Sequence, residues 1–215
     1  MTEIKICGIT DLDDALAVCE AGADAVGFIF YPKSLRSVSP RQVREIIRAL
    51  PRTIAKVGVF VNDDPGRIEE IAGICGLDLI QFHGDETPEF CRRFPAPRVI
   101  KALSPRTADD LKRAGDYPVR AILVDAFAPG LYGGTGKTSN WELAREIGER
   151  CPLILSGGLN SGNIRDAIES VRPQAVDINS GVESSPGRKD HDRVREIIGM
   201  IRHSAGKKED SIFHD

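Results

Sequence analysis

The chain has 215 residues, of which 41% are hydrophobic and 28% are charged. This ordinary globular composition supplies enough apolar material for one sizeable core. The formal net charge is −3, and the basic residues are scattered along the chain instead of forming a stripe, which disfavours nucleic-acid binding. No apolar stretch approaches the length of about 18 residues that indicates a membrane span.

The five cysteines lie far apart and form no C-x-x-C pair. This spacing favours reduced thiols over disulfides. Together with the absence of an apolar span or of an N-terminal targeting segment, it predicts a cytoplasmic protein with no membrane partner.

Short apolar runs recur along the chain, and segments with helical spacing lie between them. Val43, Ile46, Ile47 and Leu50, for example, recur as they would on one face of a helix. The runs that we predict to be strands are Ile4–Ile9, Ala25–Phe30, Ala55–Val61, Leu79–His83, Arg98–Ala102, Ala121–Asp125, Leu153–Ser156 and Ala175–Asn179.

Most of these runs are continuously hydrophobic, as is typical of parallel strands covered by helices. Eight strand–helix units predict an α/β fold of one domain, a closed (β/α)8 TIM barrel over residues 1–204. A doubly wound open sheet is the alternative, but Cys7-Gly8-Ile9-Thr10 is not the glycine-rich loop that usually follows its first strand. Residues 205–215 are predicted to be a flexible, solvated tail, since Gly206–Asp210 offers nothing to bury.

Two glycine-containing loops follow the seventh and eighth predicted strands, where barrels commonly bind phosphate. Gly157 and Gly158 lie in the first loop, and Ser180 and Gly181 lie in the second. Glycine lets backbone N–H groups approach an anion closely, and we expect a short helix beginning near Ser184-Ser185-Pro186 to point its N-terminus at the same anion. Ordinary tight turns are the alternative.

Several motifs together resemble the phosphoribosylanthranilate isomerase family. They are Lys5-Ile6-Cys7-Gly8-Ile9-Thr10, Gly27-Phe28-Ile29-Phe30 followed by Ser34 and Arg36, Val57-Gly58-Val59-Phe60, Gln81-Phe82-His83-Gly84, Gly133-Gly134-Thr135-Gly136 and the two glycine loops. The resemblance extends from Ile4 to Glu183. The chain departs from the family in Ser139-Asn140-Trp141 and in Asn179-Ser180-Gly181, where the family usually has Phe-Asp-Trp and Ser-Ser-Gly.

The resemblance implies an Amadori rearrangement of N-(5′-phosphoribosyl)anthranilate in tryptophan biosynthesis, with no cofactor and no metal. An acid protonates the ribose ring oxygen as the ring opens to a Schiff base, and a base then removes the C2′ proton. By resemblance, Asp125 is the general acid and Cys7 is the general base.

The residues themselves leave alternatives open for this pair. An aspartate at this position also serves turns, and a cysteine at a strand end is commonly a small buried hydrophobe. A Cys7 thiolate needs a nearby positive charge. Lys5 lies on the same strand face at period two, although it fits equally well as an ion-pair residue inside the barrel.

Three further features belong to the predicted substrate site. Arg36 is the predicted anchor for the anthranilate carboxylate, since a guanidinium matches a carboxylate bidentately, and a solvated loop arginine is the alternative. His83 is a candidate for a hydrogen bond in the pocket, or else a structural histidine. The loop from Ala126 to Asn140 is predicted to be a mobile cover.

Two other functions compete with this one. A different sugar-phosphate isomerase or epimerase barrel would share the phosphate loops, but an epimerase is expected to show metal-binding histidines at strand ends, and a histidine-pathway isomerase an aspartate in place of Cys7. A non-catalytic barrel that binds a phosphorylated ligand is the second alternative. The sequence is compatible with a monomer and with a homodimer.

Overall fold

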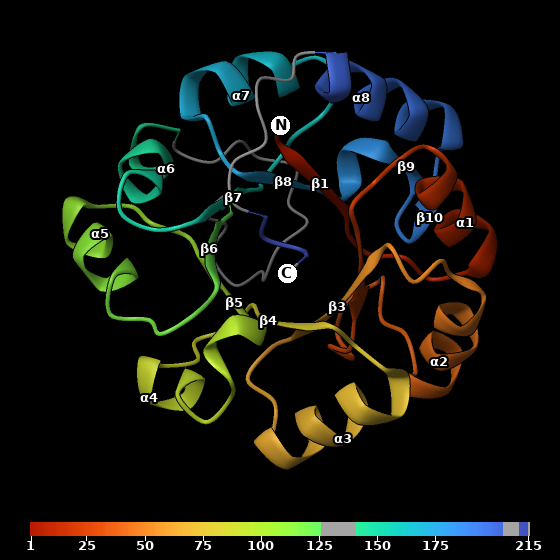
Figure 1. Ribbon diagram of the computed structural model, residues 1–215, viewed down its shortest axis with the longest axis horizontal. Coiled ribbons are helices and arrows are strands. Elements are labelled where there is room, and N and C mark those ends of the chain that lie inside the picture. The colour runs from red at the N-terminus through yellow and green to blue at the C-terminus, as the bar shows by residue number, and fades with distance from the viewer. Residues whose placement is uncertain (126–140, 204–210, 215) are drawn as a thin grey trace.

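The computed structural model describes residues 1–125, 141–203 and 211–214. Eight parallel strands form a closed barrel in chain order, and β1 pairs with both β2 and β8. The helices surround the strands as an outer ring (Figure 1). The prediction of a single (β/α)8 barrel is therefore confirmed, and the open-sheet alternative is wrong.

The strands are β1 Glu3–Ile6, β2 Ala25–Ile29, β3 Ala55–Phe60, β4 Leu79–Phe82, β5 Val99–Leu103, β6 Ala121–Val124, β7 Leu153–Leu155 and β8 Ala175–Ile178. The helices are α1 Leu12–Glu20, α2 Pro40–Ala49, α3 Pro65–Cys75, α4 Pro88–Cys91, α5 Ala108–Ala114, α6 Trp141–Gly148, α7 Ile164–Val171 and α8 His191–His203. Short 3-10 helices η1 (Ala96–Arg98) and η2 (Ser180–Val182) and a small hairpin of β9 (Glu183–Ser185) and β10 (Arg188–Lys189) complete the described elements.

Side chains alternate between two cores along each strand, since successive residues of a strand point to opposite faces. On β2, Val26 and Phe28 belong to the outer core between the barrel and its helices. Ala25 belongs instead to the inner core within the barrel. The strands β2 to β8 contribute to both cores, which explains why most of the predicted runs are almost continuously hydrophobic. On β1, the inward residues Glu3 and Lys5 are buried charged side chains instead.

The inner core is lined by small side chains at the amino end of the strands. Ala25, Ala55, Ala121 and Ala175 all belong to this core, and their short side chains leave room for residues from outside the strands to pack among them. Ile212 and Phe213 are 1% and 5% exposed and pack in the same cluster, and the blue segment 211–214 lies in the middle of the ring in Figure 1.

The carboxylate of Glu3 holds this C-terminal segment at the barrel. It accepts hydrogen bonds from Ser211 Oγ at 2.6 Å, Ile212 N at 2.6 Å and Phe213 N at 3.2 Å. The prediction that residues 205–215 form a solvated tail is therefore wrong for residues 211–214. The prediction rested on the polar residues that precede this segment and did not consider Ile212 and Phe213, whose burial stabilises the barrel.

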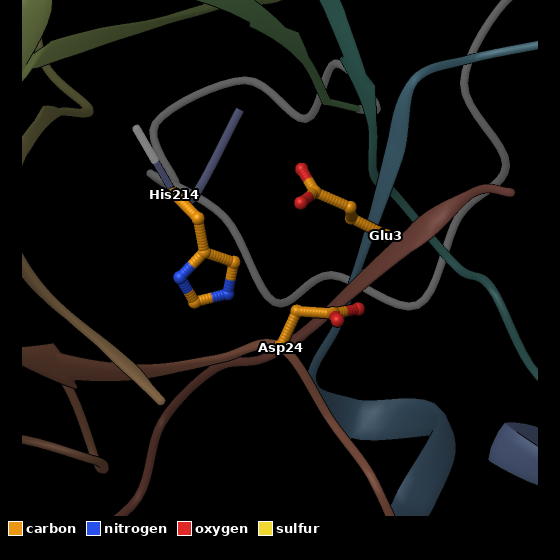
Figure 2. A group of neighbouring side chains, drawn as sticks. All are labelled: Glu3, Asp24 and His214. Carbon is orange, nitrogen blue, oxygen red and sulfur yellow. The ribbon is translucent and has the colours of Figure 1, made fainter. Parts of the chain in front are cut away.

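Glu3, Asp24 and His214 lie close together at this end, with ligand atoms within 4.8 Å of one another (Figure 2). Protein donors already occupy the carboxylates, because Asp24 Oδ2 accepts from Ile4 N at 2.7 Å and from Arg202 Nη2 at 2.6 Å. The cluster thus ties the C-terminal segment, β1 and α8 together. Among the described helices, none is long and apolar enough to cross a membrane.

Candidate active site

A cavity opens at the carboxyl end of the strands. We call it the mouth cavity. Inward-facing residues at the ends of the strands, and residues of the loops that follow them, surround this cavity. It is lined by Cys7, Ile29, Tyr31, Ser34, Arg36, Val59, Val61, His83, Asp125, Ser156, Asp177 and Asn179. The structure therefore brings Cys7, Arg36, His83 and Asp125 together around one space.

Cys7 is buried directly after β1, and Lys5 lies two residues before it. Lys5 Nζ forms an ion pair with Asp177 Oδ2 at 2.9 Å, and both side chains are almost fully buried. The interpretation of Lys5 as an interior ion-pair residue is confirmed. Burial alone would lower the pKa of Lys5, but the negative charges of Asp177 and Cys7 outweigh it and raise the pKa above its ordinary value.

The surroundings of Cys7 shift the pKa of its thiol in opposite directions. Burial raises its pKa, and Asp177 adds to that rise, while the ammonium groups of Lys5 and Lys189 lower it only in part. The net result is a pKa above the ordinary value, so the protonated thiol dominates at neutral pH in the protein without ligand. A positive charge near Cys7 is present as predicted, but it does not by itself produce a thiolate.

Lys189 is a site residue that the sequence analysis did not identify. Its fully buried ammonium donates to Asn179 Oδ1 and to Glu183 Oε1, each at 3.0 Å. Burial is the main cause of its lowered pKa, because Glu183 only partly offsets the loss of solvation. Lys189 lies on β10, beyond the residues that carried the family resemblance, and no local motif indicated its role.

Arg36 is held by Glu183, 147 residues later in the chain. Arg36 Nε donates to Glu183 Oε1 at 2.8 Å, and Nη2 donates to Oε2 at 2.6 Å. The Arg36 side chain is only 12% exposed, so Arg36 is not a solvated loop arginine. Glu183 occupies one edge of the guanidinium and fixes its orientation at the mouth cavity.

His83 and Asp125 are in direct contact. His83 Nε2 lies 3.1 Å from Asp125 Oδ2, and Gln81 Nε2 lies 2.9 Å from His83 Nδ1. His83 therefore hydrogen-bonds within the cavity, which was one of the two roles considered for it from the sequence. The loop that follows it is held from below, since Lys101 Nζ donates to Gly84 O at 2.7 Å and to Glu86 Oε2 at 2.9 Å.

The two glycine loops lie against each other beside the cavity. A Cβ on Gly181 would lie 1.9 Å from the carbonyl oxygen of Leu159, so only glycine permits this close approach. Gly157 and Gly158 have φ angles of +90° and +66°. No backbone hydrogen bond from the N–H groups of Gly157, Gly158 and Gly181 to a loop or turn of the described residues is found.

Two further predictions concern the loops after the sixth and eighth strands. The short helix expected near Ser184-Ser185-Pro186 is wrong, because these residues belong to the β9–β10 hairpin, and a single 3-10 turn at Ser180–Val182 stands after β8 instead. Gly187 has a φ of +83° and makes the hairpin turn. The predicted cover from Ala126 to Asn140, with its Gly133–Gly136 motif, lies outside the described residues.

The closed barrel and its polar mouth place this protein among the (β/α)8-barrel enzymes, whose reactive residues lie at the carboxyl ends of the strands. Sequence comparison identifies the group within that class. The profile of the family described as N-(5′-phosphoribosyl)anthranilate (PRA) isomerase matches residues 4–200. The chain therefore belongs to the N-(5′-phosphoribosyl)anthranilate isomerase family.

Individual relatives agree with this assignment. An N-(5′-phosphoribosyl)anthranilate isomerase of Syntrophus aciditrophicus is 56% identical over 209 residues, which cover 97% of this chain and 91% of the relative. One from Geobacter sulfurreducens is 52% identical over 198 residues, covering 92% and 97%. A crystal structure of phosphoribosyl anthranilate isomerase with reduced 1-(o-carboxyphenylamino)-1-deoxyribulose 5-phosphate superposes with a TM-score of 0.83 at 45% identity, covering 94% of this chain and 100% of that one.

Proposed function

We propose that this protein isomerises N-(5′-phosphoribosyl)anthranilate to 1-(2-carboxyphenylamino)-1-deoxyribulose 5-phosphate, a step of tryptophan biosynthesis, with Cys7 as general base and Asp125 as general acid. The observation that carries the proposal is that both residues, which follow the non-neighbouring strands β1 and β6, face one cavity. Family membership supplies the reaction, and the cavity supplies two proton-transferring groups that can act on opposite sides of a bound sugar.

The reaction needs two proton transfers at the sugar. Asp125 donates a proton to the ribose ring oxygen while the C1′–O bond breaks and the amine lone pair forms the C1′=N bond of a Schiff base. The Cys7 thiolate then takes the proton from C2′, and the electrons of that C–H bond form a C1′=C2′ bond and neutralise the nitrogen. The resulting enolamine becomes the aminoketone when the C2′ hydroxyl proton is lost and C1′ is protonated.

Cys7 must lose its proton before it can act as the base. Burial opposes this loss, since it raises the pKa of the thiol. Lys5 and Lys189 stabilise the thiolate once it forms, because both ammonium groups lie near Cys7 and partly counter the effect of burial. We infer that the two lysines hold the thiol within reach of ionisation without making it a permanent thiolate.

The two ends of the substrate have separate binding groups in this proposal. Arg36 binds the anthranilate carboxylate with the edge of its guanidinium that Glu183 does not occupy. Gly157, Gly158, Ser180 and Gly181 bind the phosphate through backbone N–H groups at the point where the two glycine loops touch. The complexed relative holds a phosphorylated, carboxyphenyl-substituted compound, which carries the same two anionic groups.

Turnover of freshly generated N-(5′-phosphoribosyl)anthranilate by the purified protein tests the proposal. Wild-type protein is expected to convert the substrate without added metal, while Cys7→Ala and Asp125→Asn each reduce kcat by about 100-fold or more and keep the circular dichroism spectrum of the wild type. If the wild type does not convert this substrate, the proposed function is wrong. Full activity of either variant would remove that residue from its assigned role.

The assembly of this protein is a separate prediction. A structure from Thermotoga maritima concerns monomers of a dimeric phosphoribosylanthranilate isomerase, and for this chain monomer and homodimer are both compatible with a closed barrel. Sedimentation velocity distinguishes them. The cytoplasmic location likewise stays a prediction, to be tested by fractionation of cells that express the protein.

A further inference from the structure

Three side chains form a line that ends at the proposed acid. Gln81 lies on β4 one inward position below His83 and is fully buried. Its amide nitrogen lies 2.9 Å from His83 Nδ1, and the other ring nitrogen, Nε2, lies 3.1 Å from Asp125 Oδ2. His83 therefore connects a fixed side chain in the barrel interior to the carboxyl group at the mouth.

We propose that Gln81 and His83 are positioning residues for the acid: Gln81 selects the His83 tautomer that carries its proton on Nε2, and this N–H holds Asp125 Oδ2 as a hydrogen-bond acceptor. The transferable proton of Asp125 is then confined to Oδ1. The inference rests on the proposed function for the role of Asp125. It goes beyond that function by assigning the tautomer of His83 and the oxygen that delivers the proton.

The tautomer follows from the donors and acceptors present. In the structure the Gln81 amide presents its nitrogen to Nδ1 of His83, and an amide nitrogen can only donate; in this orientation Nδ1 accepts and carries no proton. A neutral imidazole then bears its proton on Nε2 and donates it to Asp125 Oδ2. A carboxylate accepts this bond with either oxygen, and a neutral carboxyl accepts it with its carbonyl oxygen, so the bond persists whether or not Asp125 is protonated.

The opposite tautomer would have the opposite effect on the acid. If Nδ1 carried the proton, Nε2 would be an acceptor, and a protonated Asp125 would direct its O–H at His83 instead of at a substrate. Gln81 selects between the two tautomers because its amide nitrogen, a hydrogen-bond donor, faces Nδ1. The tautomer of His83 thus decides whether the acid proton is available, in the way that an outer hydrogen bond fixes the orientation of a catalytic or metal-binding histidine.

The burial of Gln81 is consistent with a fixed role. Its Oε1 atom is buried and has no hydrogen-bond partner among the described residues, which is costly for a polar group. Replacing Gln81 by an apolar side chain would relieve that cost. A glutamine at this position is therefore explained by the one bond that it does make, to His83 Nδ1.

The tautomer is measured directly by ¹⁵N NMR of the full-length protein with labelled histidine, at pH 8. Long-range ¹H–¹⁵N correlations distinguish a protonated from an unprotonated ring nitrogen, and the His83 signals are assigned by their loss in His83→Gln. The proposal expects Nε2 protonated and Nδ1 unprotonated in the wild type. A proton on Nδ1, alone or together with Nε2, would overturn the proposal whether or not the protein turns over the proposed substrate.

Kinetics test whether the tautomer matters. His83→Phe is expected to reduce kcat by about 100-fold with KM little changed, whereas His83→Gln, which can place an amide N–H near the position of Nε2, retains most of kcat. Gln81→Met, similar in shape but unable to donate, is expected to reduce kcat by about tenfold. His203→Phe, a change at an exposed position on α8, is the control and leaves kcat unchanged.

Other kinetic outcomes contradict the inference. A raised KM with unchanged kcat in His83→Phe would make His83 a substrate-binding residue. Equal losses in His83→Gln and His83→Phe would show that the Nε2 donor is not what matters. Failure of the wild type to convert the substrate would overturn the proposed function, while the NMR result would still decide which tautomer Gln81 selects.

Discussion

The two ends of the barrel are built from the same strands but differ in what their inward side chains do. At the carboxyl end, Cys7, His83 and Asp125 carry titratable groups and line one cavity. At the amino end, the alanines Ala25, Ala55, Ala121 and Ala175 face a space that Ile212 and Phe213 fill. Position along the strand, more than the strand itself, therefore decides whether an inward residue serves chemistry or packing.

A polar layer formed by Lys5, Gln81 and Asp177 lies at the floor of the mouth cavity, and Asp177 itself lines the cavity. Each of them precedes, by two residues on its own strand, a residue that lines the mouth cavity: Cys7, His83 and Asn179. Buried polar groups are costly unless they are paired. Their presence directly beneath the mouth indicates that the barrel interior sets the charge and orientation of the residues above it.

The largest expected effect on stability comes from the amino end. Phe213→Ala empties the space between the strand alanines and should lower the free energy of unfolding by about 3 to 5 kcal/mol, with kcat unchanged below the melting temperature. Chemical denaturation measures the change. Ile74→Ala, at a half-exposed position on α3, is the control. A loss no larger than that of the control would mean that the C-terminal segment does not stabilise the barrel.

A second change separates binding at the mouth from packing. Gly181→Ala places a Cβ against Leu159 O and should force the two glycine loops apart. We expect KM to rise about tenfold, as for the loss of one charge-assisted hydrogen bond to phosphate, while Gly199→Ala, where a Cβ meets open space, leaves KM unchanged. Steady-state kinetics give both values. An unchanged KM in Gly181→Ala would place the phosphate elsewhere.

The raised pKa of Cys7 predicts how its reactivity depends on pH. Burial keeps the thiol protonated, so its alkylation by iodoacetamide should be slow at neutral pH and rise about tenfold with each pH unit up to the raised pKa. Mass spectrometry of the Cys7 peptide measures the rate constant separately from the other cysteines. A rate that is already constant above pH 8 would show a permanent thiolate and contradict the environment described for Cys7.

The smallest expected effect concerns the pair of Arg36 and Glu183. Burial would raise the pKa of Glu183, but its bonds with Arg36 and Lys189 outweigh burial and lower the pKa below 4.5. A lowered pKa means that the ionised group stabilises the folded state above that pH, and that this contribution is lost as the pH falls through the folded-state value. Wild-type protein should therefore lose stability below pH 4.5 more steeply than Glu183→Gln.

Acid titration of the free energy of unfolding checks this prediction. Glu169→Gln, a change at an exposed position on α7, is the matched control and should retain the wild-type slope. Identical slopes for wild type and Glu183→Gln would mean that the pair does not stabilise the fold.

Much of the barrel could be predicted because its signals are local. Each predicted strand overlaps an observed one, and Lys5 was placed on the face of Cys7 by the two-residue period alone. The C-terminal segment could not be predicted in this way. Ile212 and Phe213 pack against residues that come from seven different strands, and no short stretch of sequence shows that these residues meet.

Partners in the site were harder to predict than the site residues. His83 and Asp125 were each placed at a strand end, but their contact depends on how the barrel closes, and Arg36 meets Glu183 across 147 residues. The hairpin of β9 and β10 did have a local signal. Pro186-Gly187 is a dipeptide typical of turns, and it favours a turn over the helix that we expected there.

The most direct test of the division between the two ends compares Asp125→Asn with Phe213→Ala, measuring kcat and melting temperature for both. We predict that Asp125→Asn loses about 100-fold or more in kcat and keeps the melting temperature of the wild type, while Phe213→Ala melts at a lower temperature and keeps kcat. A folded Phe213→Ala variant that loses kcat as severely as Asp125→Asn would contradict the separation of chemistry from packing along the strands.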